Sequence, residues 1–328
     1  MRAMAREHYG DAYALRLVEL PAPEPAADEV LIAVGAVAVS AGDVALLHGV
    51  PLVVRAAFGL RRPKQPVIGG DIAGEVVAVG AKVTRFAVGD AVFAESDQGG
   101  FAEFAVVPER FVAHRPANVD VVHAAAVPVS GVTALQGLRL AGLEGADAGS
   151  GRRVLVTGAS GGVGCFAVQL AKAMGAHVTG VCRTEKAEHV LGLGADEVVD
   201  HTREDVTSSG RRYDVVFDLV ADHSLGALRR VLEPRGVLVV ASGSGGRVLG
   251  PLGRIAAASA ISPFVSQRLA VLAARRDGDD LAELARRIDA GEVRPVVDRV
   301  FPLEQAADAV RRFESGAVRG KLVLAVAP

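Results

Sequence analysis

The residues best suited to chemistry in this chain of 328 residues are the glycines of one short turn. Gly158, Gly161 and Gly164 follow the apolar run Val154–Val156 and precede the helical run Phe166–Met174. Glycines at this spacing permit a sharp turn, a close approach of the backbone to a pyrophosphate, and tight packing of a helix on a strand. The N-terminus of the helix then offers free N–H groups to phosphate oxygens. Glycine-rich turns also serve plain packing, but the continuing β–α pattern favours a dinucleotide site. The expected phosphate contacts are Ser160, Gly161, Gly162 and Val163.

The tip of the next strand indicates which nicotinamide dinucleotide is bound. Binders of NAD carry an acidic residue about 20 positions beyond the glycines, which accepts the ribose hydroxyls. Here the strand His177–Cys182 is followed by Arg183, Thr184 and Lys186. Two cations and a hydroxyl suit a 2′-phosphate. The alternative is a pair of solvated charges at a helix start, where cations oppose the helix dipole. We therefore predict NADP(H) as the cofactor.

One dehydrogenase class is excluded by its missing catalytic pair. The motif Thr157-Gly158-x-x-x-Gly162-x-Gly164 also fits short-chain dehydrogenases, which need a Tyr with a Lys four residues later. The tyrosines are Tyr9, Tyr13 and Tyr213, and at that spacing they are followed by Tyr13, Leu17 and Phe217. More than 150 residues also precede the motif, which does not fit a short-chain architecture.

Further motifs are spread over essentially the whole chain. They are Ser40–Asp43, Pro66–Gly74, Val79–Gly80, Gly89–Val92, Gly100–Phe104, Ala125–Leu135 and Gly320–Leu324. Together with the turn Ala159–Gly164, they resemble the medium-chain dehydrogenase/reductase superfamily, in its zinc-free quinone oxidoreductase branch, which includes zeta-crystallin. The insert from Gly245 to Arg268 is similar to a subgroup related to mitochondrial reticulon-4-interacting and chloroplast-envelope reductase homologues.

This resemblance implies an α/β fold with two interleaved domains. A GroES-like, partly open β-barrel catalytic domain is expected from residues 1–118 and 280–328, and a Rossmann domain with a doubly wound parallel sheet from 119–279. The local pattern agrees, because short strands with Gly and Asp turns fill the first part. After about residue 119, strands and helices alternate, as in a covered parallel sheet. The predicted strands there are Arg153–Thr157, His177–Cys182, Glu197–Asp200, Asp214–Val220 and Gly236–Ser242.

The same resemblance bears on metal and on the reaction. Zinc members carry Cys where Asp43 stands and His-Glu where Gly70-Asp71 stands, and their structural zinc loop needs four cysteines near residues 95–115. This chain has two cysteines in all, and its eight histidines are scattered with no paired spacing, whereas zinc takes three or four N or S ligands. We expect no metal. The expected reaction is hydride transfer from NADPH to a quinone or to the β-carbon of an α,β-unsaturated carbonyl compound. The alternative is an NADPH-binding sensor or crystallin-like protein with little turnover.

Four residues are candidates for catalysis. Asp43 and Asp71 stand at the former metal-ligand positions and are expected to order water or relay a proton. The alternative is that Asp43 caps a helix and Asp71 satisfies backbone donors. Ser40 stands where relatives often have an Asn that contacts the nicotinamide ribose, and Ala45 where many have a larger polar residue. His48 is expected in the middle of the cleft from its position, and a structural role is the alternative. No general acid stands out, so proton delivery from water remains open.

Further cofactor contacts are expected by analogy with the family. These residues are Ser130, Thr133, His201 and Lys321. Val220, Ser242, Gly243 and Ser244 are expected contacts for another reason, because they end predicted strands at the carboxyl edge of the sheet, where nucleotides bind. For Ser130 and Thr133, the alternative role is helix capping. For His201 it is packing alone, and for Lys321 it is a side chain in solvent.

Composition narrows the partners. The net charge is −2, from 36 basic and 38 acidic residues, which indicates no nucleic-acid partner. Two cysteines exclude a disulfide scaffold. No stretch of about 20 apolar residues predicts a membrane span, and no apolar leader is seen, so we expect a cytoplasmic protein. The segment Pro234–Arg276 has arginines and no acid. A substrate-pocket wall and the interface of a homodimer are favoured there over a peripheral membrane contact.

Overall fold

The computed structural model describes residues 1–145, 147–241 and 248–326. These residues form two compact units. The first unit contains Met1–Val132, Arg276–Gly291 and Pro295–Pro328, and the second contains Thr133–Arg275 and Glu292–Arg294. By this division the first segment of the first unit continues beyond residue 118. It ends within the helix α4 (Pro128–Leu140). The domain limits drawn from the sequence stay a prediction.

The first unit is built around the long strand β3 (Glu29–Val39). Within the described residues, the strand order of its main sheet is β14-β15-β3-β4-β5-β7, and β6 also pairs with β3. Strand β3 lies antiparallel to both β4 (Asp71–Val79) and β15 (Lys321–Ala325). The last strand of the chain therefore pairs with a strand near its start. Burial alternates along the first part of β3 and becomes continuous from Ala36 to Val39, where both faces are covered.

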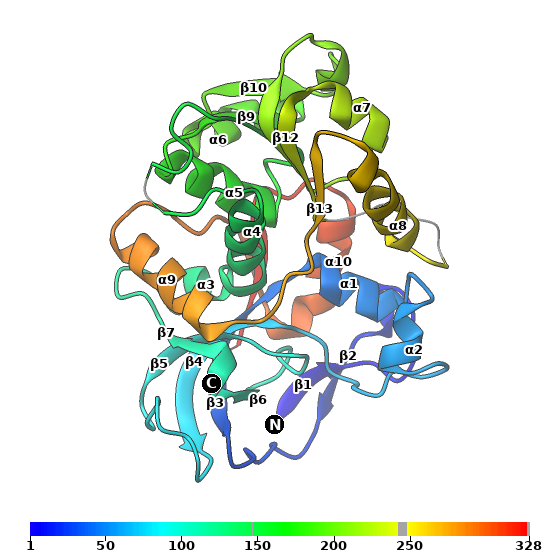
Figure 1. Cartoon of the computed structure of the whole chain (residues 1–328). Helices are drawn as coiled ribbons and strands as arrows, with labels where there is room; N and C mark the ends of the chain where they lie inside the picture. Colours follow the sequence, from blue (N-terminus) through cyan, green and yellow to red (C-terminus); the bar gives the residue numbers. More distant parts are fainter. Residues whose placement is uncertain (146, 242–247, 327–328) are drawn as a thin grey trace. The chain divides into compact units, whose positions relative to one another are not determined.

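The remaining elements of the first unit are the other strands of this sheet, a separate two-stranded sheet of β1 and β2, and helices and turns (Figure 1). The other strands are β1 (Arg2–Ala5), β2 (Arg16–Glu19), β5 (Ala91–Glu95), β6 (Phe104–Pro108), β7 (Val112–His114) and β14 (Val297–Pro302). The helices are α1 (Ala41–His48), α2 (Val54–Phe58), α3 (Val121–Ala125), α9 (Gly278–Asp289) and α10 (Ala306–Glu314). Short 3-10 turns lie at η1 (Ala12–Ala14), η2 (Glu109–Phe111) and η6 (Leu303–Gln305).

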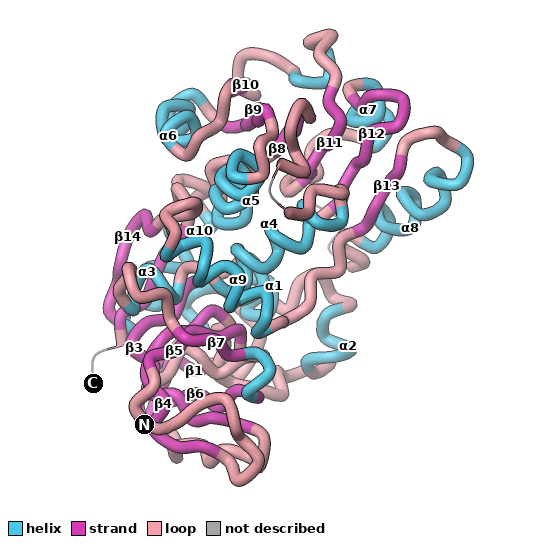
Figure 2. The backbone as a smooth tube through the Cα atoms, turned by 60° about the vertical axis from the view of Figure 1, so that its left-hand side comes forward, coloured by secondary structure: helices cyan, strands magenta, loops and turns pink. Residues whose placement is uncertain are grey.

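The second unit is a parallel sheet covered by helices. Across the described residues its strand order is β10-β9-β8-β11-β12-β13, and every pair in it is parallel. Figure 2 shows these strands side by side. Their bounds are β8 (Arg153–Val156), β9 (His177–Cys182), β10 (Glu197–Asp200), β11 (Tyr213–Asp218), β12 (Leu232–Val240) and β13 (Arg268–Val271). The predicted doubly wound parallel sheet is confirmed. The chain order reverses at β8, between β9 and β11, and ligands bind at such switch points.

Helices and turns complete the second unit. Besides α4, they are α5 (Gly162–Ala173), α6 (Ala187–Gly192), α7 (Leu225–Arg230), α8 (Leu252–Ile261), η3 (Thr184–Lys186), η4 (Val206–Ser208) and η5 (Ser262–Phe264). Helix α5 contacts β8 and β9 and is buried on all faces from Gly164 to Ala171. Of the helices in the described residues, none is long and apolar enough to cross a membrane.

Candidate functional site

The glycine turn lies between β8 and α5, as the sequence predicts. Gly158 has a φ of +65°, a conformation that side chains disfavour. A Cβ atom on Gly164 would lie 2.2 Å from the carbonyl oxygen of Gly158, so only glycine allows the helix to start this close to the turn. Gly161 is the N-cap of α5 and provides no capping side chain, and the first turn of α5 has no acidic residue. The turn therefore fits a pyrophosphate at the helix N-terminus.

The predicted phosphate contacts come together at this turn. Ser160 is buried, and Gly162 and Val163 are the first residues of α5. Val220, just beyond β11, is 42% exposed and approaches the turn, since a Cβ on Gly158 would lie 2.7 Å from its Cγ2 atom. The predicted contacts Ser242, Gly243 and Ser244 lie outside the described residues.

The 2′-phosphate site stays a prediction, and its residues differ in exposure. Arg183 is exposed at the end of β9. The alternative of a solvated Lys186 is wrong, since this residue is only 7% exposed in η3. The Thr184 hydroxyl donates to the carboxylate of Asp200, which also accepts from Thr202. These hydrogen bonds lower the pKa of Asp200 to about 2.

Asp200 was missed by sequence reasoning. It ends β10 directly beside Cys182, the last residue of β9. The sequence did contain a signal for it. Parallel strands end at the same edge of a sheet, and the predicted strand Glu197–Asp200 ends in an acid. Its charge lies next to the residues proposed to bind the 2′-phosphate.

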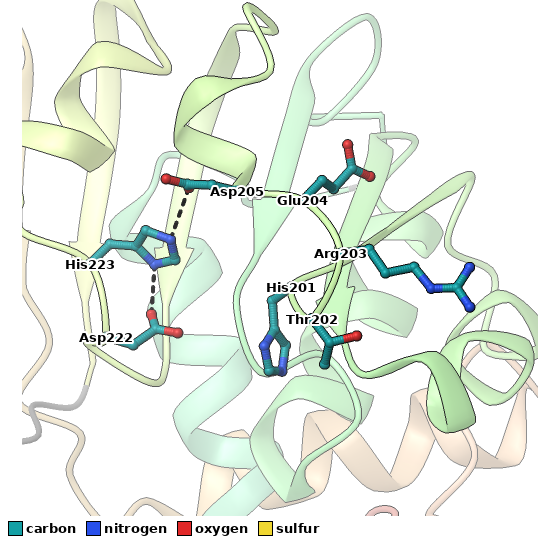
Figure 3. A pocket seen from close by; sticks show the side chains of 7 residues that line it. All are labelled: His201, Thr202, Arg203, Glu204, Asp205, Asp222 and His223. Atoms are coloured by element: carbon teal, nitrogen blue, oxygen red, sulfur yellow. Dashed lines mark hydrogen bonds and ion pairs between the residues drawn. The ribbon is translucent and has the colours of Figure 1, made fainter.

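A shallow pocket lies beyond the ends of β10 and β11 (Figure 3). Its volume is about 450 Å³, and it is lined by His201, Thr202, Arg203, Glu204, Asp205, Asp222 and His223. His223 lies between two carboxylates, with Nδ1 2.7 Å from Asp222 and Nε2 3.2 Å from Asp205. Partial burial lowers the pKa of His223, but these two carboxylates outweigh it and raise the pKa overall. His201, expected beside the adenosine, lies in the wall of this pocket.

In the first unit, Ser40 and Asp43 form a capping box on α1. The helix begins at Ala41, so Ser40 rather than Asp43 is its N-cap. The Ser40 hydroxyl donates to Asp43 Oδ2 at 2.7 Å, and the backbone N–H of Gly69 donates to Asp43 Oδ1 at 3.1 Å. Burial raises the pKa of Asp43 to about 6, although the hydrogen bond from Ser40 opposes the shift.

Asp71 and Lys321 form a buried ion pair between the first residues of β4 and β15. Lys321 Nζ lies 2.7 Å from Asp71 Oδ2, and the side chains are 4% and 0% exposed. The backbone N–H of Val129 donates to Asp71 Oδ1 at 2.5 Å. The alternative of a solvated Lys321 is therefore wrong, and the alternative that Asp71 satisfies a backbone donor is confirmed.

The carboxylates of Asp43 and Asp71 do not fit a zinc ion. The ammonium of Lys321 already balances the charge of Asp71, and backbone N–H groups occupy further oxygens of both acids. Within the described ranges, no group of three or more His, Cys, Asp or Glu side chains is arranged to hold a metal ion.

Glu95 is a second carboxyl that the sequence analysis did not single out. It lies opposite Asp71 in the register of β4 and β5, and is half-buried. Burial raises the pKa of Glu95 to about 7, with Asp71 adding to the shift and Arg276 and Lys321 opposing it. Only the pairing of the two strands reveals this neighbour, because 24 positions separate the two acids.

Three predicted site residues remain, namely His48, Ser130 and Thr133. His48 Nε2 lies 2.5 Å from Glu314 Oε1 of α10, a position at the surface of the first unit. Ser130 is 3% exposed on α4, and Thr133 follows on the same helix, half-buried. Neither is brought to the glycine turn by any hydrogen bond of the described residues. Their role as cofactor contacts stays a prediction.

Comparisons with known proteins agree with this architecture. Residues 26–117 match the family model described as the alcohol dehydrogenase GroES-like domain, and residues 193–324 match the model described as a zinc-binding dehydrogenase. The chloroplast envelope quinone oxidoreductase homolog of Arabidopsis thaliana is 34% identical over 99% of this chain and 98% of its own length. The NADPH-dependent alkenal/one oxidoreductase of the same plant is 32% identical over 99% of this chain and 79% of its own length.

Solved structures give the same result. The quinone oxidoreductase from Coxiella burnetii superimposes with a TM-score of 0.85 at 25% identity, covering 100% of this chain and 99% of its own. The Escherichia coli quinone oxidoreductase complexed with NADPH superimposes with a TM-score of 0.83 at 25% identity, covering 99% and 100%. With a relative of 34% identity matched along nearly its whole length, the chain belongs to the medium-chain dehydrogenase/reductase superfamily, in the zeta-crystallin-like branch of quinone oxidoreductases.

Proposed function

We propose that the protein is an NADPH-dependent reductase that transfers hydride to a quinone or to the β-carbon of an α,β-unsaturated carbonyl compound. The observation that carries this proposal is the glycine turn at the N-terminus of α5, where Gly164 leaves no room for a side chain. Relatives support the choice of reaction. One is named as an NADPH-dependent alkenal/one oxidoreductase, and another is a quinone oxidoreductase complexed with NADPH.

NADPH, when bound, supplies the hydride, and the protein's residues bind and orient it. In this proposal the first N–H groups of α5 hold the pyrophosphate, and Arg183 pairs with the 2′-phosphate. His201 and Val220 contact the adenosine side of the cofactor. Family analogy suggests Lys321 for the nicotinamide end, and within the first unit its ion pair with Asp71 fixes the position of its charge.

The reaction also consumes one proton. Asp43 and Glu95 hold a proton closer to neutral pH than ordinary carboxyls do, because burial raises the pKa values to about 6 and about 7. We propose that these groups keep protons and ordered water available on the first unit, while the final donor is a water molecule.

The substrate class is tested by steady-state oxidation of NADPH. Quinones, enones and enals are compared with saturated aldehydes as acceptors. Oxidation of simple alcohols is measured separately, as reduction of NADP⁺. We expect turnover with quinones or conjugated carbonyls and none with alcohols. Turnover of alcohols at a comparable rate would contradict the proposal.

One observation favours a second candidate, a cofactor-binding protein with little turnover. The Ser40 hydroxyl is used in the capping box of α1, and Ala45 offers no polar group in its place. A binding protein of this kind would bind NADPH tightly and show no acceptor in the same panel. Calorimetry of NADPH binding, measured beside the kinetic panel, therefore separates the two candidates.

The choice of NADPH over NADH is tested at Arg183. The substitution Arg183→Glu places a negative charge beside the proposed 2′-phosphate, so we expect NADPH affinity to fall by about tenfold or more while NADH affinity changes little. Arg299→Glu is the matched control, an exposed arginine on β14 of the first unit. Equal loss of both cofactors, or none, would remove Arg183 from the site.

The expected homodimer and cytoplasmic location belong to the same proposal. Sedimentation of the purified protein tests the first, and localisation of a tagged full-length chain tests the second.

A further inference from the structure

Asp218 connects the glycine turn to the loop that follows β11. It is the last residue of β11, and its side chain is 0% exposed. Asp218 Oδ1 accepts from the Thr157 hydroxyl at 2.9 Å and from the backbone N–H of Ala221 at 3.1 Å. The Thr157 hydroxyl in turn accepts from the backbone N–H of Leu219 at 2.9 Å. Because Thr157 directly precedes Gly158, one buried carboxylate orients both segments.

Arg254 of α8 holds the same carboxylate from the other side. Its Nη2 donates to Asp218 Oδ2 at 2.5 Å, and its Nη1 donates to the carbonyl oxygen of His223 at 2.7 Å. The Arg254 side chain is 13% exposed. A single guanidinium thus bonds Asp218, just before the loop Leu219–His223, and His223 at its end, in the fork geometry that arginine favours. Arg254 lies in the acid-free segment Pro234–Arg276, so its partner must come from elsewhere in the chain.

The loop Leu219–His223 adopts a conformation that depends on such bonds. Ala221 has a φ of +63°, which costs roughly 1 kcal/mol or more for a residue with a side chain. Val220 approaches Gly158 so closely that a Cβ there would lie 2.7 Å from Val220 Cγ2. The loop therefore forms one wall of the glycine turn, and its position decides the space left beside Gly158.

We propose that Arg254 is a positioning residue for the dinucleotide. Through Asp218 and the carbonyl of His223, it holds the loop Leu219–His223 against the glycine turn, and so ties α8 of the insert to the cofactor site. This inference rests on the proposed use of NADPH. The bound cofactor need not contact Arg254, because the effect passes through Asp218, Thr157 and the loop.

The ion pair is better explained by position than by stability. A buried pair of opposite charges adds little net stability over apolar side chains of similar size, because both ions lose their hydration. Its cost is repaid when a defined geometry is needed. Here that geometry is a loop with a positive φ beside the turn expected to bind pyrophosphate.

The test uses a variant in which both charges are removed. Arg254→Met alone leaves Asp218 buried without its partner, which is strongly destabilising. The double variant Asp218→Asn with Arg254→Met carries no buried charge, and the new amide keeps an oxygen for Thr157 and Ala221. We expect its Tm to return close to that of the wild type, while the Kd for NADPH, measured by calorimetry, rises by about tenfold.

Two further variants separate positioning from folding. Arg229→Met is the matched control, since Arg229 of α7 also bonds across the second unit, to Gln267 at 2.9 Å, but does not touch the turn. It is expected to leave NADPH affinity unchanged. Arg254→Lys keeps the charge but bonds only one of the two partners, so a partial rescue is expected, with the Kd raised by about threefold.

Hydrogen exchange of the ligand-free protein gives an independent readout. The backbone N–H groups of Leu219 and Ala221 are expected to exchange about tenfold faster in the double variant than in the wild type or in Arg229→Met. A double variant that binds NADPH as the wild type does, with unchanged exchange, overturns the inference and leaves the proposed function intact. A wild-type protein that does not bind NADPH overturns both.

Discussion

Arg6 carries a buried charge that few contacts compensate. It is 1% exposed, and none of its three guanidinium nitrogens has a hydrogen-bond partner among the described residues. Its guanidinium carbon lies 5.5 Å from the centroid of the Tyr9 ring, a cation–π contact. Burial lowers the pKa of Arg6, although Tyr9 and Asp43 oppose the shift. A buried group of this kind costs free energy, since it has exchanged water for few interactions.

Replacement of Arg6 by an apolar residue should therefore stabilise the fold. We expect Arg6→Met to raise the free energy of unfolding by about 1 kcal/mol, measured by urea denaturation. Arg55→Met is the control, because Arg55 stacks on the same ring at 4.5 Å and also donates to the carbonyl oxygens of Gly49 and His48. It should lower stability. A loss of stability in Arg6→Met would indicate a bonding role for this guanidinium.

Glu95 and Asp43 give the first unit a pH dependence. In the folded state the pKa values of these acids are raised, to about 7 and about 6. Between the ordinary pKa values near 4 and these raised values, the folded state binds more protons than the unfolded state. The free energy of unfolding therefore falls as pH rises from about 4 to about 7, and stays low above.

The substitution Glu95→Gln tests this dependence. It should flatten the fall in stability between about pH 4.5 and 7 and make the protein more stable than the wild type at about pH 8. Denaturant titrations over this pH range measure both effects. Glu75→Gln on β4, where the side chain is exposed, is the control and should leave the profile unchanged. An unaltered profile in Glu95→Gln would contradict the assignment.

At the scale of elements, the strand–turn–helix unit β8–α5 depends on one close approach. The missing side chain of Gly164 lets the first turn of α5 pack on the backbone of Gly158 and Ala159. Gly192, at the end of α6, has open space around it, since a Cβ atom there would meet no other atom within 4 Å. The two helical glycines therefore have different roles.

Substitution of each glycine by alanine distinguishes these roles. Gly164→Ala should lower NADPH affinity by at least about tenfold, because the turn must open to admit a Cβ atom. Gly192→Ala should leave NADPH affinity unchanged and raise stability by about 0.5–1 kcal/mol, since alanine loses less backbone entropy in a helix. Calorimetry and thermal unfolding of the pair provide the comparison. Tight NADPH binding by Gly164→Ala would exclude the turn as the pyrophosphate site.

Several elements were predictable because their information is local. The strands His177–Cys182 and Glu197–Asp200 have the predicted bounds. By contrast, β12 begins at Leu232 rather than at Gly236, because its start pairs with Tyr213 of β11 in a shifted register. Strand β6 likewise begins at Phe104, where its pairing with β3 starts. The first residue of each of these strands is therefore set by where its pairing with the neighbouring strand begins.

At the scale of the whole molecule, both units are assembled from distant segments. In the first unit, Leu324 of β15 lies opposite Val37 of β3. The ion pair of Asp71 and Lys321 follows from this arrangement, because 250 positions separate its members. This ion pair bears on metal binding, because one of the matching family models is described as a zinc-binding dehydrogenase.

We expect the purified protein to carry no stoichiometric zinc and to keep its NADPH oxidation after treatment with a chelator. The physical reason is that Lys321 already balances the Asp71 carboxylate, at 2.7 Å, where zinc members have a ligand position. Metal analysis by mass spectrometry and activity after dialysis against EDTA are the measurements. One zinc ion per chain, with activity lost on its removal, would contradict this expectation.

The sequence by itself determined what depends on neighbours along the chain. The spacing of Gly158, Gly161 and Gly164 predicted the strand–turn–helix unit, and alternating apolar runs predicted the parallel sheet, because backbone conformation and burial follow local residue types. The family motifs then indicated the reductase class. The same resemblance argued against zinc, because zinc members carry Cys where Asp43 stands and His-Glu where Gly70-Asp71 stands.

Only the tertiary structure decided which side chains meet. It paired Lys321 with Asp71, placed Glu95 opposite the same acid, and used the Ser40 hydroxyl to cap α1. It also joined Arg254 of the insert to Asp218 beside the glycine turn. Such contacts depend on strand register and helix docking, which bring together residues far apart in the chain, and the buried charges among them are stable only where a partner from another element completes the pair.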